Sequence, residues 1–189
     1  LGGFAWFAKQ GAIFGDTTLA ANHVLLQFVS MSAFFLDGFA HVSEMLSGKA
    51  IGAKDKQGFI TQIKDSTQIA GVTAILLGSG IMLFAPLVIS FISKDAQVQA
   101  IAEQHAVYAG VYIIVSFVAF QLDGVFIGAT RSKEMRNTSI ISLLVLIGAG
   151  TILTQYYGNI GLWISFIIYV IARGVSLGAY MPKLVRELF

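Results

Sequence analysis

Five long apolar stretches follow one another along this chain, separated by short polar breaks. They cover residues 18–47, 69–93, 106–130, 138–157 and 160–181. Each is long enough to cross a bilayer, since about 20 apolar residues in a helix span its hydrocarbon core. Residues 1–15 are also apolar but too short for a complete crossing. The pattern predicts an all-α, polytopic membrane helix bundle with five complete transmembrane helices and the tail of a sixth, whose beginning is missing.

The composition supports a lipid environment. Hydrophobic residues make up 56% of the chain and charged residues only 12%, against about 25% charged residues in soluble domains. The absence of cysteine excludes disulfides, thiolate metal sites and cysteine nucleophiles. A net charge of +2 gives no reason to expect nucleic acid as a partner. No catalytic triad, phosphate-binding glycine loop or HExxH motif occurs, so we expect neither an enzyme nor a metal site nor a bound cofactor.

The basic residues alternate between the two sides of the predicted bundle. Nine of the twelve fall on one side: Lys49, Lys54, Lys56, Lys64, Arg131, Lys133, Arg136, Lys183 and Arg186. Lys94 is the single basic residue of the opposite side, and Lys9 and Arg173 lie within spans. Because cytoplasmic loops carry an excess of lysine and arginine, this pattern predicts that the nine residues and the C-terminus are cytoplasmic.

Four charged residues lie inside the predicted spans: Asp37, Glu44, Asp123 and Arg173. A charge at the centre of a bilayer costs roughly 2.5–3.5 kcal/mol, so such residues normally face the bundle interior or a watery cavity. From the helical rise, Asp37 lies about 18 Å, Asp123 about 12 Å and Arg173 about 15 Å from the basic interface. Glu44 lies only about 7 Å from it, close enough for its side chain to reach the interface.

Three of the polar side chains share one helix face. Asp37, His41 and Glu44 are spaced at i, i+4 and i+7, and Ser30 continues the same face one heptad earlier. Two carboxylates and an imidazole on one face can hold and pass a proton or a cation. The alternative is that the buried acids pair with one another and with Arg173, and only hold the helices together.

Two segments carry a resemblance to a known family. They are LAANHVLLQFVSMSAFFLDGFAHVSEMLSGKAIGAKDK at residues 19–56 and FQLDGVFIGATRSKEMRN at residues 120–137. Both place Leu-Asp-Gly inside an apolar stretch, and together they resemble the multidrug and toxic compound extrusion (MATE) family. The resemblance implies a twelve-helix antiporter of two lobes, of which residues 1–189 would form the C-terminal six-helix lobe with a truncated first helix.

The resemblance also implies a function. Members of this family export small organic, often cationic and amphipathic compounds in exchange for protons or sodium, by alternating access. The expected partners are the substrate, membrane lipid and the missing N-terminal lobe, and the expected location is a bacterial inner (plasma) membrane. We expect Asp37 and Asp123 to bind the cation or proton, His41 and Glu44 to support them, and Arg173 to be the charge partner. Two alternatives are a lipid-linked saccharide flippase of the same superfamily and a non-transporting membrane scaffold.

Overall fold

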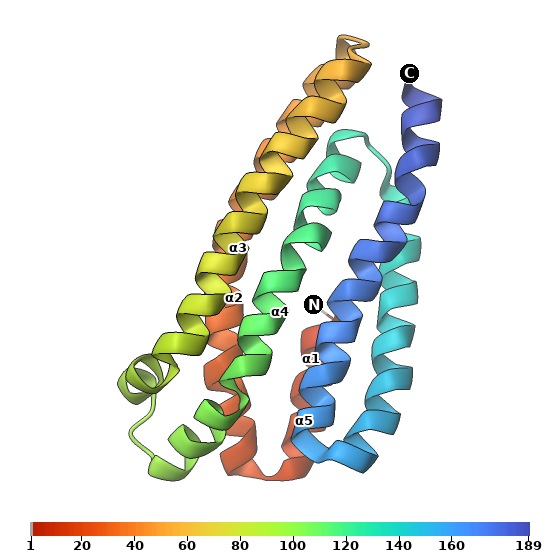
Figure 1. The fold of residues 1–189 in the computed structure, drawn as a ribbon. Helices are drawn as coiled ribbons and strands as arrows, with labels where there is room; N and C mark the ends of the chain where they lie inside the picture. Colours follow the sequence, from red (N-terminus) through yellow and green to blue (C-terminus); the bar gives the residue numbers. More distant parts are fainter. Residues whose placement is uncertain (1) are drawn as a thin grey trace.

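The computed structural model describes residues 2–189, which are almost entirely helical (Figure 1). Its elements are α1 (Gly2–Gly11), the 3₁₀ turn η1 (Ala12–Phe14), α2 (Asp16–Gly52), α3 (Lys56–Ile92), α4 (Ala96–Gly128) and α5 (Ser132–Leu188). Leu1, the first residue of the predicted partial span, lies outside the described residues. The prediction of an all-α bundle of apolar helices is confirmed for the described part of the chain.

The longest helix, α5, is divided by a glycine. Gly158 has φ 55° and ψ −133°, a backbone conformation that interrupts the helix and that a side chain would strain. Figure 1 shows α5 reversing direction here, so we call residues 132–157 its first arm and residues 159–188 its second arm. The reversal falls in the polar break between the predicted spans 138–157 and 160–181. The number of crossings, five and a partial sixth, stays a prediction.

The helices extend past the ends of the predicted spans, because the polar residues that flank the apolar stretches are also helical. Lys49 lies inside α2 and Lys64 inside α3, which leaves residues 53–55 as the connection between these two helices. Asp55 begins α3 by accepting a hydrogen bond from the backbone N–H of Gly58 at 2.8 Å. Asp95 begins α4 in the same way through the N–H of Gln97, also at 2.8 Å. These are N-caps, which satisfy donors that the first helical turn leaves free.

The connections gather at two opposite ends of the bundle. Residues 53–55, residues 129–131 and the C-terminus lie at one end, whereas η1, residues 93–95 and Gly158 lie at the other (Figure 1). The nine basic residues named above lie within or close in sequence to the first of these groups, so we call that end the basic end. The connections thus alternate between the two ends, as the loop charges predicted, and the assignment of the basic end to the cytoplasm stays a prediction.

Close glycine contacts hold α4 in the middle of the bundle. A Cβ atom at Gly124 would overlap the carbonyl oxygen of Ala40, and one at Gly128 would overlap that of Glu44, both in α2. On another face of α4, a Cβ at Gly110 would lie 2.8 Å from the carbonyl oxygen of Gly78 in α3. Small residues spaced four apart let backbones approach where lipid supplies no hydrophobic drive. Helix α4 therefore packs backbone against backbone with both α2 and α3.

The outer surface of α3 is strongly apolar. Its exposed large side chains include Ile69, Val72, Leu76, Leu83, Phe84, Leu87 and Phe91. A soluble protein rarely exposes so continuous an apolar surface. This face suits contact with lipid tails, and it places α3 at the periphery of the bundle.

The glycine packing generates a stability prediction. We expect Gly124→Ala to destabilise the protein by about 1–3 kcal/mol, the usual cost of overpacking, because the new methyl group must push α4 away from Ala40. Thermal unfolding in detergent would measure the loss. Gly148→Ala is the matched control, since its Cβ meets nothing within 4 Å. Equal melting temperatures for the two variants would contradict the proposed close contact.

Candidate functional site

The central feature of the candidate site is an ion pair between α4 and the second arm of α5. Nε of Arg173 donates to Oδ2 of Asp123 at 3.0 Å, and its Nη2 donates to Oδ1 at 2.8 Å. The two side chains are only 20% and 23% exposed. Such a bidentate, charge-assisted pair is among the stronger polar contacts in proteins. Both oxygens of the carboxylate are therefore engaged by a single guanidinium group.

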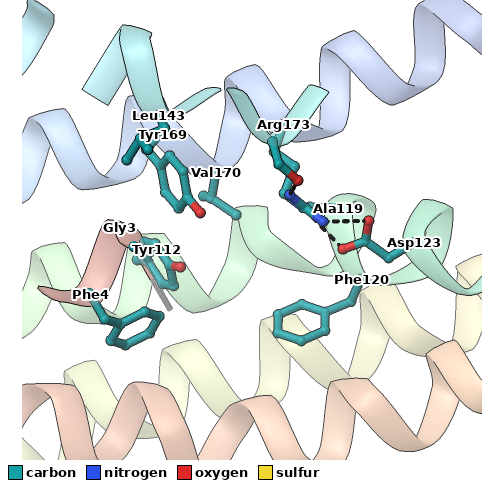
Figure 2. Close-up of a pocket in the computed structure, with 12 residues that line it drawn as sticks. Gly3, Phe4, Tyr112, Ala119, Phe120, Asp123, Leu143, Tyr169, Val170 and Arg173 are labelled. Atoms are coloured by element: carbon teal, nitrogen blue, oxygen red, sulfur yellow. Dashed lines mark hydrogen bonds and ion pairs between the residues drawn. The ribbon is translucent and has the colours of Figure 1, made fainter. Parts of the chain in front are cut away.

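The ion pair lies in the wall of a cavity of about 380 Å³. Helix α1, α4 and both arms of α5 line this space, and Figure 2 shows the ion pair on one side of it and the rings of Tyr112 and Tyr169 on the other. Phe4 and Phe120 also line it. Phe166 supports the aromatic wall from behind, with its ring stacked on that of Tyr112 at 4.5 Å between centroids. The cavity thus combines one opposite-charge pair with aromatic walls, the composition typical of small-molecule sites.

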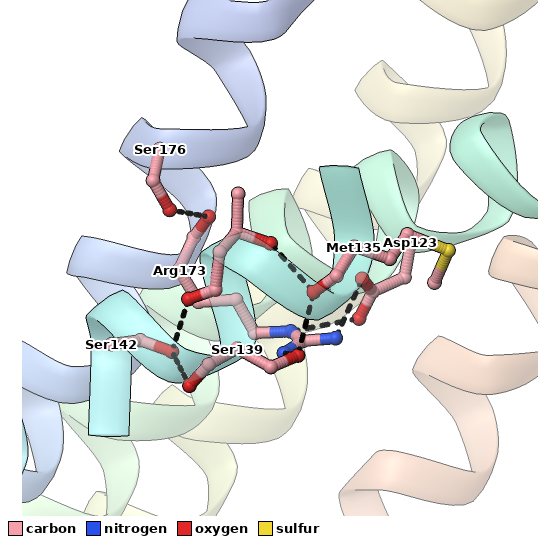
Figure 3. Close-up of polar contacts among 7 residues, drawn as sticks. Asp123, Met135, Ser139, Ser142, Arg173 and Ser176 are labelled. Atoms are coloured by element: carbon pink, nitrogen blue, oxygen red, sulfur yellow. Dashed lines mark hydrogen bonds and ion pairs between the residues drawn. The ribbon is translucent and has the colours of Figure 1, made fainter. Parts of the chain in front are cut away.

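A serine from the first arm of α5 completes the polar group. Nη1 of Arg173 donates to Oγ of Ser139 at 2.7 Å, and this Oγ in turn lies 2.8 Å from the backbone carbonyl of Met135 (Figure 3). The three partners Asp123, Ser139 and Arg173 come from three helical segments far apart in the sequence. Sequence reasoning did not find Ser139, because a serine near the start of an apolar stretch carries no signal of its own.

The other predicted site residues lie elsewhere. Asp37 and His41 are exposed on α2, and Glu44 is partly exposed. Nδ1 of His41 lies 3.3 Å from Oε2 of Glu44, so these two side chains contact each other on the shared face that their spacing predicted. Asp37 does not line the cavity of Asp123. Of the two surroundings expected for Asp37, the bundle interior and a watery cavity, the helices of residues 2–189 do not provide the first, because none of them covers that face of α2. Its role as a cation or proton site stays a prediction.

A second polar cluster lies on the opposite side of α4. Oε1 of Gln121 accepts hydrogen bonds from Ser43 of α2 at 2.5 Å and from Ser66 of α3 at 3.1 Å. Ser43 and Ser66 also contact each other at 2.9 Å. Gln121 is only 2% exposed and Ser43 is fully buried. Sequence reasoning missed this cluster, although a glutamine two residues before Asp123 inside an apolar stretch is a signal that could have found it.

The chemistry open to the site follows from the ion pair. A carboxylate held by arginine can exchange that partner for a proton or for a positively charged group of a ligand. Among residues 2–189, no three His, Asp or Glu side chains gather closely enough to hold a metal ion. The polar groups of the cavity are one carboxylate, one guanidinium, the hydroxyl of Ser139 and the phenols of Tyr112 and Tyr169.

Long apolar helices around a partly polar cavity define a class of protein, the multi-pass helical membrane proteins. Comparison with known families makes this specific, because the MatE family model matches residues 10–152. The chain belongs to the MatE family, the multidrug and toxic compound extrusion transporters. Members of this family are integral membrane transporters and not enzymes.

Similar proteins agree with this assignment. DNA damage-inducible protein F of Escherichia coli strain K12 is 32% identical over 93% of this chain and 38% of its own length. The probable multidrug resistance protein NorM of Rhizobium meliloti strain 1021 is 26% identical over 92% of the chain and 39% of its own length. The chain thus spans about two fifths of the length of these relatives.

A solved structure shows the same fold. The crystal structure of the eukaryotic MATE transporter AtDTX14 matches with a TM-score of 0.80 at 18% sequence identity. The match covers 90% of this chain and 40% of that protein. At this identity the likeness establishes the arrangement of the helices.

The ion pair generates a second prediction. We expect Asp123→Ala and Arg173→Ala each to lower thermal stability, since each leaves an unpaired charge among apolar helices. The double variant should lose less than the sum of the two, by about 0.5–3 kcal/mol, the coupling typical of residues in contact. Unfolding of the purified protein in nanodiscs would measure all three.

The control for this cycle pairs Asp123→Ala with Lys64→Ala, which lies on the exposed surface of α3. These two changes should add, because the residues share no partner. Additive losses in the Asp123 and Arg173 cycle as well would contradict a coupled ion pair.

Proposed function

We propose that this chain forms the C-terminal lobe of a two-lobed secondary active transporter. The protein exports organic, often cationic or amphipathic compounds in exchange for protons or sodium, by alternating access. The observation that carries the proposal is the Asp123–Arg173 pair in a cavity lined mainly by α4 and α5, two helices long and apolar enough to span a membrane. Membership of the MatE family supports it independently.

The lobe assignment is supported by length and by surface. The chain covers about two fifths of its relatives, which leaves room for a second lobe of similar size. Asp37 and His41 are exposed on a helix that is apolar enough to cross a membrane. Because a charge in contact with lipid is costly, this face of α2 requires water or another part of the protein beside it. A cavity between two lobes would supply both.

We propose the following orientation. The basic end is cytoplasmic, and with it the C-terminus, because cytoplasmic ends carry the excess of lysine and arginine. The relatives from Escherichia coli and Rhizobium meliloti support a bacterial inner membrane as the location.

The coupling ion is proposed to be the proton. A sodium ion needs several oxygen ligands, whereas both oxygens of Asp123 already accept hydrogen bonds from Arg173. A proton needs only one carboxylate oxygen and can replace Arg173 as its partner. Asp37 is the second candidate proton site, with His41 and Glu44 as supporting polar groups on the same face of α2.

Two other functions are less well supported. A flippase for lipid-linked saccharides needs a strongly basic cavity for the pyrophosphate, whereas Arg173 is the sole basic residue lining the cavity described here and is already paired. A non-transporting scaffold would use the pair only to hold helices together. It would predict no gradient-driven efflux, and a charge swap between Asp123 and Arg173 that keeps the protein stable.

The transport proposal predicts the effect of neutralising each acid. In proteoliposomes containing the intact protein, an imposed pH gradient should drive efflux of a fluorescent organic cation. Asp123→Asn or Asp37→Asn should each reduce this efflux at least about tenfold. An asparagine cannot take up and release the coupling proton, so the gradient no longer drives export through that residue. A sodium gradient applied in parallel tests the other coupling ion.

Asp65→Asn is the matched control, since Asp65 is exposed near the polar start of α3. It should leave efflux unchanged. Full efflux in both the Asp37 and the Asp123 variants would mean that the coupling residue lies outside this lobe. No efflux under either gradient would favour the flippase or the scaffold.

A further inference from the structure

Ser139 is the third partner of the Arg173 guanidinium group. A guanidinium carries five N–H donors in a rigid plane. Two of its nitrogens, Nε and Nη2, donate to Asp123, and the remaining one, Nη1, donates to Ser139 at 2.7 Å. Each nitrogen of the group thus has a partner, and the partners come from α4 and from the first arm of α5. Contacts on two sides fix the plane of the guanidinium as well as its position.

The orientation of the Ser139 hydroxyl is itself determined. Its Oγ lies 2.8 Å from the carbonyl oxygen of Met135, one helical turn earlier, which can only accept. The hydroxyl therefore donates to the carbonyl oxygen of Met135 and accepts from Nη1 of Arg173; Figure 3 shows both contacts. Because the backbone of the first arm holds it, this acceptor is preorganised for the guanidinium.

We propose that Ser139 is a positioning residue for proton coupling. It holds Arg173 in the orientation that pairs both carboxylate oxygens of Asp123, and so sets how readily a proton displaces Arg173. The transport consequence rests on the proposed function, whereas the positioning of Arg173 does not. Ser139 itself lines the same cavity, so it acts at the place where the carboxylate meets water or substrate.

The surroundings leave Arg173 as the nearest charged neighbour of Asp123. Across the cavity, the other titratable groups are the phenols of Tyr112 on α4 and Tyr169 on the second arm of α5. Helix α1 contributes only Gly2, Gly3 and Phe4 to the lining. Asp37 of α2 does not line this cavity. Loss of the hydrogen bond between Ser139 and Arg173 therefore directly affects the pairing of Arg173 with Asp123.

The chain offers a closely matched control. Ser142 follows Ser139 on the same arm and is fully buried. Its hydroxyl contacts only backbone carbonyl oxygens, those of Thr138 at 2.8 Å and Ser139 at 3.1 Å. Ser142→Ala removes a hydroxyl from the same helix without touching Arg173. Ser139→Thr keeps a hydroxyl at the critical position and serves as the rescue variant.

The first measurement tests positioning without any transport. Phenylglyoxal, an arginine-selective reagent, would be applied to the intact protein in proteoliposomes, and modification at Arg173 read by peptide mass mapping. Ser139→Ala should raise the modification rate at Arg173 roughly tenfold, the factor that corresponds to loss of a hydrogen bond to a charged group at the lower end of its usual strength. Ser142→Ala and Ser139→Thr should react at the wild-type rate. Equal rates for Ser139→Ala and wild type, or an equal rise in Ser142→Ala, would overturn the proposal.

The second measurement tests the consequence for coupling. The pH dependence of gradient-driven efflux should move to higher pH in Ser139→Ala, because a proton then competes with a less firmly held arginine. Ser142→Ala should keep the wild-type profile, and Ser139→Thr should restore it. An unchanged profile in Ser139→Ala, despite faster modification of Arg173, would overturn the role in coupling.

The two measurements separate the failure of this inference from that of the proposed function. If wild-type protein shows no efflux under either gradient, the transport proposal fails, and faster modification in Ser139→Ala still supports the positioning of Arg173. If wild-type protein transports normally but neither measurement responds to Ser139→Ala, the inference fails and the transport proposal stands.

Discussion

The constraint on which this structure depends is that hydrocarbon offers no hydrogen bonds. A polar side chain between the ends of these helices must therefore find its partner inside the protein. The bundle meets this requirement with polar contacts at separate levels, each joining helices that are distant in sequence. Near Gly158, the side chains of Asn22 and Asn159 exchange hydrogen bonds at 2.7 and 3.1 Å, and Trp163 donates to Asn22 at 2.9 Å. Nearer the basic end lie the clusters around Gln121 and Arg173.

Helix α4 belongs to two of these contacts at once. Gln121 and Asp123 are two residues apart, which places them about 200° apart around the helix. Gln121 accordingly bonds to α2 and α3, and Asp123 to α5. The glycines behind Asp123 bring the backbone of α4 against α2. The α2–α4 side of the helix is thus packed without space, whereas the α5 side encloses a cavity of about 380 Å³. Rearrangement of the ion pair therefore has room on one side of α4 only.

The sequence predicted the elements better than their contacts. Apolar runs indicated each long helix and the reversal near Gly158, because membrane spanning depends on composition over about 20 residues. The predicted spans end several residues before or after the helices of the structure. Capping residues such as Asp55 determine where a helix begins, and they lie outside the apolar runs. Two Leu-Asp-Gly repeats looked alike in the sequence, yet a Cβ at Gly38 would meet nothing within 4 Å whereas one at Gly124 would overlap Ala40. That difference depends on which helices are neighbours, and the spacing of residues along one helix does not predict its neighbours.

The same limit explains why the predicted site divides into two. Spacing placed Asp37, His41 and Glu44 on one face correctly, because one helix determines its own faces. It did not determine that this face points out of the bundle while Asp123 points into the α5 cavity. The two Leu-Asp-Gly repeats therefore do not give their acids one shared role, because Asp123 is paired with Arg173 whereas Asp37 is exposed on α2. An acid already paired with arginine responds to a proton by releasing a positive charge inside the lobe, whereas an exposed acid responds by losing its own charge at the surface. Protonation of Asp123 would therefore change the contacts between α4 and α5. Protonation of Asp37 would change only the charge on the exposed face of α2.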